Sequence, residues 1–111
     1  MSAITELAKR LGKAIGESPV AGEMRDARKA MEAEADLVKA VNDFQEQMEK
    51  VRKLEVEGKT IEVADKHKLT EMESVLTSSD VFKKYTAAQV EYIDMMRKVN
   101  EAIQVEIQGL Q

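Results

Sequence analysis

The sequence predicts an all-α protein, and three observations lead to that fold class. Charged residues make up 34% of the 111 positions and aromatic residues only 4%, a balance typical of helices with solvated faces. Apolar residues recur in steps of three and four over most of the chain, which is the helical period. The segment from about residue 80 to 108 contains neither Gly nor Pro. We therefore expect a single helical domain over residues 1–111.

The first helix is expected at about residues 3–17. Its apolar stripe consists of Ile4, Leu7, Ala8, Leu11, Ala14 and Ile15. Lys9, Arg10 and Lys13 lie off that stripe, so a helix lying on a membrane surface is one interpretation. The stripe lacks the aromatic residue that usually seats such a helix in lipid. A helix that faces the core of the protein is therefore the favoured interpretation.

A second helix is predicted over residues 19–32 and a third over 34–57. Ser18 and Pro19 are a start signal, because Ser caps helices and Pro suits the first helical position. The run MEAEADL at 31–37 then shifts the phase of the apolar stripe, which favours a kink near 32–36 over one long helix.

The stretch EGKT at 57–60 ends the third helix and precedes a fourth, expected over 62–77. It is not a phosphate-binding P-loop, because that motif needs a glycine at position 53, where the chain has Lys53. Gly58 is favoured as a left-handed helix cap. The alternative is a small β-hairpin over 54–63, in which alternating apolar residues flank Gly58 and Lys59.

The capping residues TSSD at 77–80 predict the start of a last helix over 80–108. At ~1.5 Å per residue this helix is roughly 40 Å long, whereas a globule of this size has a radius of gyration of about 13 Å. Short partners from the same chain cannot cover it. We therefore expect a long antiparallel helical hairpin with the middle helix, shorter flanking helices, and a homo-oligomeric bundle.

The residues that catalysis and cofactor binding need are missing from this pattern. The absence of cysteine removes disulfides, thiolate metal sites and cysteine nucleophiles. His67 is the only histidine, and the residue three before it is Ala64, so the Glu-x-x-His motif of di-metal bundles is absent. We predict no enzyme, no catalytic or metal-binding residue, no cofactor and no small-molecule substrate.

The charge pattern disfavours nucleic acid as the main ligand. The net charge is −4, and the basic clusters at 25–29 and 50–53 are diluted by neighbouring acids. No apolar run reaches membrane-spanning length, and the first residues lack the apolar core of a signal peptide. We expect a cytoplasmic protein without membrane insertion.

A protein–protein interface is the remaining candidate site. Seven methionines are present, and methionine is common both in cores and on surfaces that repack against partners. Two tyrosines seven positions apart suit the edge of an interface. The predicted interface residues are Met24, Met31, Tyr85, Tyr92, Met96, Val99, Ile103 and Ile107.

The order of several features resembles the YlbF/YmcA family of small helical bacterial proteins, which includes the YheA-type members. The resemblance extends from about residue 4 to 108. The features are Leu11-Gly12-x-x-Ile15-x-x-Ser18, the run 30–35, Phe44, Gly58-Lys59, Leu69, the set Val81, Tyr85 and Ala88, and Val99-Asn100-x-x-Ile103.

This resemblance implies an oligomeric all-α fold and a regulatory adaptor without catalytic residues. Family members influence bacterial development and RNA turnover through an RNA-degrading enzyme, and some are linked to iron–sulfur clusters through cysteines that this chain lacks. Two alternatives stay open. One is a prefoldin-like holding chaperone, suggested by the possible hairpin at 54–63. The other is an RNA-contacting accessory protein using Arg25, Arg28, Lys29, Lys50, Arg52 and Lys53.

Overall fold

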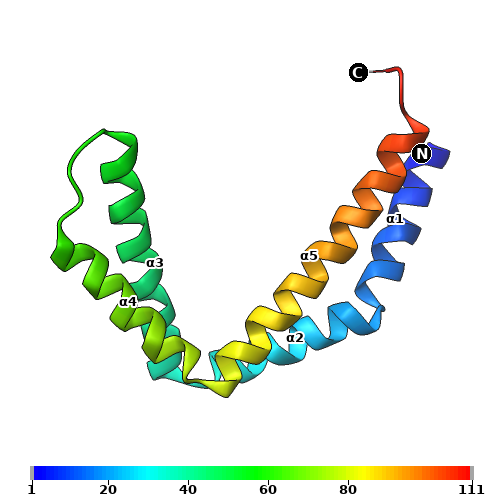
Figure 1. Ribbon diagram of the computed structural model, residues 1–111. Coiled ribbons are helices and arrows are strands. Elements are labelled where there is room, and N and C mark those ends of the chain that lie inside the picture. The colour runs from blue at the N-terminus through cyan, green and yellow to red at the C-terminus, as the bar shows by residue number, and fades with distance from the viewer. Residues whose placement is uncertain (1, 111) are drawn as a thin grey trace. The chain divides into compact units, whose positions relative to one another are not determined.

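The computed structural model describes residues 2–110, and these residues form five α-helices and no strand (Figure 1). The helices are α1 (Ala3–Gly16), α2 (Pro19–Glu32), α3 (Ala35–Val56), α4 (Val63–Thr77) and α5 (Asp80–Glu106). The all-α fold class is therefore confirmed. The helix ends lie within two residues of the ranges expected from the sequence, and the largest difference is at the end of α5.

The chain divides into two compact units. Unit 1 contains the described residues up to Arg28 and those from Tyr85 onward, and unit 2 contains residues 29–84. The boundaries fall inside α2 and α5, so both helices contribute to each unit. The expected hairpin between α3 and the last helix stays a prediction, as does the single domain.

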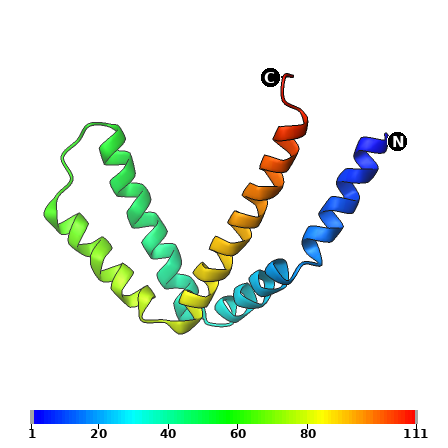
Figure 2. The ribbon, with the colours of Figure 1, turned by 45° about the vertical axis from the view of Figure 1, so that its right-hand side comes forward.

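Unit 2 is built on an antiparallel hairpin of α3 and α4 (Figure 2). Leu37 near the start of α3 and Leu76 near the end of α4 are both buried, and Leu76 is only 1% exposed. Val51 and Gln47 are buried further along α3. Because the helices are antiparallel, Leu37 and Leu76 lie at one end of the pair and Val51 lies towards the other. The hydrophobic effect therefore holds α3 and α4 together along most of their length.

The turn after α3 is a left-handed helix cap. Gly58 has a φ of 70°, a conformation that glycine adopts without the steric cost other residues meet. The N–H of Gly58 donates to the carbonyl of Glu55 at 3.1 Å, and the N–H of Lys59 donates to that of Leu54 at 2.9 Å. These two bonds form the Schellman motif. The helix cap is therefore confirmed, and the alternative β-hairpin over 54–63 is wrong.

The segment 19–57 is interrupted at Ala33 and Glu34, where the apolar stripe shifts phase. Glu34 has an extended backbone (φ −109°, ψ 95°), and its side chain makes no capping hydrogen bond to α3. Its N–H donates to the carbonyl of Met31 at 3.1 Å, which closes the last turn of α2. The segment is therefore two helices.

Unit 1 begins with α1, and Ser18 then caps α2. The hydroxyl oxygen of Ser18 accepts a hydrogen bond from the N–H of Ala21 at 3.2 Å, and its proton is directed to the carbonyl of Ile15 at 2.6 Å. The same hydroxyl lies 3.7 Å from the sulfur of Met95 on α5. Ser18 therefore ties the junction of α1 and α2 to α5. Ala21, Met24 and Ala88 are the buried apolar residues of this unit.

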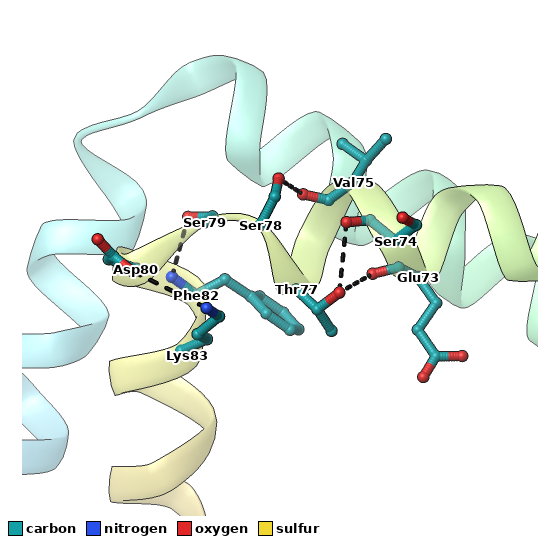
Figure 3. A network of polar contacts seen from close by, with 9 residues as sticks. All are labelled: Glu73, Ser74, Val75, Thr77, Ser78, Ser79, Asp80, Phe82 and Lys83. Atoms are coloured by element: carbon teal, nitrogen blue, oxygen red, sulfur yellow. Dashed lines mark hydrogen bonds and ion pairs between the residues drawn. The ribbon is translucent and has the colours of Figure 1, made fainter.

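A cluster of hydroxyl side chains lies where α4 ends and α5 begins (Figure 3). Ser79 caps α5, because its hydroxyl oxygen accepts from the N–H of Phe82 at 3.1 Å. Thr77 donates to the carbonyl of Glu73 at 2.9 Å, and Ser78 donates to that of Val75 at 2.6 Å. These bonds give carbonyls in the last turns of α4 a side-chain donor. Helix α5 then begins two residues after Ser78.

The apolar stripe of α1 is exposed, in contrast to the expectation that it faces the core. No residue of α1 is buried. Ile4 is 79% exposed, Leu7 59% and Leu11 39%. The periodicity correctly indicated an apolar face, but no element among residues 2–110 buries it.

Candidate interaction surface

Helix α5 carries part of the exposed apolar surface of unit 1. Tyr92, Ile93 and Met96 line a shallow hollow of about 460 Å³, which Arg97, Asn100, Glu101 and Gln104 complete. Ile93 is 59% exposed, although it lies beside the apolar stripe that runs along α5 through Tyr92, Met96 and Ile103. An apolar floor with charged and amide groups at its margin suits a protein–protein contact.

A second hollow, of about 310 Å³, lies between the end of α1, the first half of α2 and Tyr92 of α5. Its apolar lining includes Ile15, Ala21 and Met24. Arg25 and Arg28 also line it. Tyr92 therefore borders two hollows, one on the side of α2 and one on the open side of α5.

Charged side chains of α5 are held in place by ion pairs along the helix. Arg97 pairs with Asp94 at 2.8 Å and with Glu101 at 2.6 Å, and Lys98 pairs with Asp94 at 3.1 Å. The hydrogen bond from Arg97, followed by that from Lys98, lowers the pKa of Asp94 below its ordinary value. Asp94 therefore stays ionised, and the bases beside it are partly neutralised.

The predicted interface residues fall into three groups by exposure. Met24 is 9% exposed and packs within its own chain. Met31, Tyr85, Tyr92, Met96 and Val99 are half-buried. Ile103 and Ile107 are exposed, at 43% and 37%. The structure brings Tyr92 and Met96 together in one hollow and places Val99 in another, beside Val20 and Met95.

Sequence reasoning missed four members of the exposed apolar surface. Ile93 was outside the stripe, and the helical period alone gave no signal for it. Ile4, Leu7 and Leu11 of α1 were recognised as an apolar face but were assigned to the core. The small size of the chain was the available signal, because a short chain has few elements with which to cover five apolar faces.

A polar cluster in unit 2 joins α3 to the start of α4. The buried amide of Gln47 donates to the backbone carbonyl of Asp65 at 3.2 Å and lies 3.4 Å from its carboxylate. Lys50 donates to the same carboxylate at 3.2 Å. The hydrogen bond from Lys50 is the main cause that lowers the pKa of Asp65 below its ordinary value, and that from Gln47 adds to it. These contacts join α3 to the start of α4.

The bases suggested for RNA contact are partly used within the chain. Arg52 pairs with Glu49, and Lys50 pairs with Asp65 at 3.2 Å. The pKa of Glu49 is lowered by its hydrogen bond from Arg52. Each such pair reduces the positive potential that a phosphate backbone would meet.

His67 lies exposed on α4. Within residues 2–110, no three His, Cys, Asp or Glu side chains gather closely enough to hold a metal ion. Over the same residues, no helix combines the length and the apolar content needed to cross a bilayer.

These features define a small all-α protein with an uncovered apolar face. A solved structure with the same fold is a protein of unknown function (DUF964) from Bacillus stearothermophilus, which superposes with a TM-score of 0.76 at 11% sequence identity. The match covers 98% of this chain and 96% of that one. The family model described as control of competence regulator ComK, YlbF/YmcA, matches residues 4–108, and the chain therefore belongs to this family. No curated protein sequence matches it.

The resemblance inferred from the order of sequence features is thus confirmed. The description of the family indicates a regulatory role, and neither match names an enzyme family.

Proposed function

We propose that this chain is a non-enzymatic regulatory adaptor of the bacterial cytoplasm, which acts by binding another protein and assembles as a homo-oligomer. The exposed apolar surface of unit 1 carries the proposal. Ile93 and Ile103 on α5 and Leu7 on α1 are 59%, 43% and 59% exposed. Several large apolar side chains exposed on one unit are typical of a site that binds another protein, because burying them in an interface removes apolar surface from water.

The family description supports the regulatory part of the proposal, because it names control of a competence regulator. The hollow of Tyr92, Ile93 and Met96 is the surface that we assign to the partner protein. Its combination of methionine, tyrosine and a flanking arginine is enriched at protein interfaces. The prefoldin-like alternative loses its basis, since it depended on a β-hairpin at 54–63 that the described residues do not contain.

Affinity capture with a matched pair of variants tests partner binding. Ile93→Glu places a charge in the hollow, whereas Val75→Glu places one at a similarly exposed position of α4 (62% exposed). We expect the wild type and Val75→Glu to retain the same protein and Ile93→Glu to lose it. Equal recovery of that protein by both variants would reject the assigned surface.

Analytical ultracentrifugation tests the oligomeric part. We expect a species heavier than the 12.4 kDa chain at micromolar concentration. A single 12.4 kDa species would reject self-association while leaving partner binding to the capture experiment.

A further inference from the structure

Two apolar stripes of unit 1 are left exposed by the described residues of their own chain. Helix α1 has no buried residue, and its stripe from Ile4 to Leu11 is about 10 Å long. Every described residue from Asn100 onward is exposed as well, including Ile103 and Ile107. That second stripe, from Val99 to Ile107, is about 12 Å long. The two stripes are similar in length, and neither one covers the other within a single chain.

The charges of the two helices are complementary. Helix α1 carries three bases and one acid, a net charge of +2. Residues 91–106 of α5 carry four acids and two bases, a net charge of −2. Opposite net charge favours docking of α1 on α5 and disfavours the pairing of two α1 helices with each other.

A second copy of the chain carries both stripes. Each exposed stripe of one copy can therefore meet an apolar stripe on a helix of opposite net charge in the other copy.

We infer that α1 of one copy docks on the C-terminal part of α5 of a second copy, and that the reverse contact forms by two-fold symmetry. The interface joins the stripe of Ile4, Leu7 and Leu11 to that of Val99, Ile103 and Ile107. This inference rests on the self-association in the proposed function and names the surfaces that carry it. The hollow around Ile93 is left to the partner protein.

Engineered cysteines test the contact directly, because the chain has no cysteine of its own. Chains carrying Leu7→Cys are mixed with chains carrying Ile103→Cys and joined with a short flexible bismaleimide. We expect a cross-linked pair of unlike chains in high yield. Glu55→Cys, at an exposed position of α3, replaces Ile103→Cys in the control and should give only background.

A charge placed in the stripe tests the energy of the contact. Leu7→Glu is expected to raise the dimer Kd at least ~30-fold, the effect of losing a central interface side chain. Val90→Glu adds the same charge to an exposed site (66%) on α5, outside the stripe, and should leave the Kd unchanged. Both positions are exposed, so circular dichroism should show unchanged helix content in each variant.

Three results would overturn the inference. If Leu7→Glu still forms the dimer and positions 7 and 103 give no cross-link, these two surfaces are not the interface. The chain would still self-associate, but through other residues. A doubly substituted chain, Leu7→Cys with Ile103→Cys, that cross-links within itself at high dilution would show that α1 closes on its own α5. The third result concerns vesicles that contain an anionic lipid. If Leu7→Glu no longer binds them while its oligomeric mass stays that of the wild type, the stripe is a membrane contact.

Discussion

The side-chain amide of Gln47 on α3 donates to the backbone carbonyl of Asp65 on α4 at 3.2 Å and reaches its carboxylate at 3.4 Å. Gln47 is 5% exposed, so the amide is satisfied by α4 and not by water. The side chain of Gln47 therefore joins α3 to α4 through both the backbone and the side chain of Asp65.

Replacing Gln47 by Ala should destabilise the protein by about 1–3 kcal/mol, because it removes two hydrogen bonds and leaves a buried void. The free energy of unfolding in urea is the measurement. Gln45→Ala is the matched control, since Gln45 lies on the same helix with an exposed side chain, and its effect should stay within ~0.5 kcal/mol. Equal losses in the two variants would show that the bonds to Asp65 contribute nothing.

Stability should fall in acid partly through Asp65. Because the folded pKa of Asp65 is lowered, chiefly by the hydrogen bond from Lys50, the unfolded chain binds the proton more tightly. This contribution is complete above the unfolded pKa of about 4 and disappears as the pH falls through the lower folded pKa. The urea midpoints of the wild type and Asp65→Asn should therefore converge between about pH 5 and pH 2.

The control for the acid experiment is Gln45→Ala, at an exposed position of α3, which removes no titratable group. Its midpoint should differ from that of the wild type by a similar amount at every pH. If the gap between wild type and Asp65→Asn stays constant down to pH 2, the folded state does not hold this carboxylate in its ionised form.

Helix positions could be predicted from the sequence because their ends depend on local chemistry. Ser18 and Ser79 cap the helices that follow them, and Gly58 ends the one before it. Each signal acts within a few residues of itself, so it needs no knowledge of the tertiary structure. The same holds for the shift of the apolar stripe at 31–37, which marks the break between α2 and α3.

The faces of the helices were harder to predict, because burial depends on which element lies opposite. In α3, steps of three and four from Leu37 to Val51 also include Met48, yet Met48 is 44% exposed and its neighbour Gln47 is buried. The position of Asp65 across the hairpin decides between them, and no local pattern in α3 reveals it. For α1 the pattern was correct, but no helix in the described part of the chain buries this face.

Opposite effects are expected from alanine at two glycines. Gly58→Ala should destabilise by about 1 kcal/mol, because its φ of 70° strains any residue with a Cβ. Gly22→Ala, inside α2, should stabilise by about 0.5–1 kcal/mol through helix propensity. No atom lies within 4 Å of a Cβ added at either site, so packing plays no part. Chemical denaturation measures both, and effects of the same sign would contradict this assignment of the turn.

Ser79→Ala should lower the stability by about 1 kcal/mol, because the N–H of Phe82 then loses its capping acceptor at the start of α5 (Figure 3). For a chain of this size that loss corresponds to a fall in Tm of about 4 °C. Ser78→Ala is the neighbouring control: its hydroxyl only donates to the carbonyl of Val75 at an exposed site, so its Tm should change by less than about 2 °C. Ser79→Asp keeps a capping acceptor and should restore most of the stability. A Tm for Ser79→Asp as low as that for Ser79→Ala would show that the hydroxyl of Ser79 acts through something other than the cap.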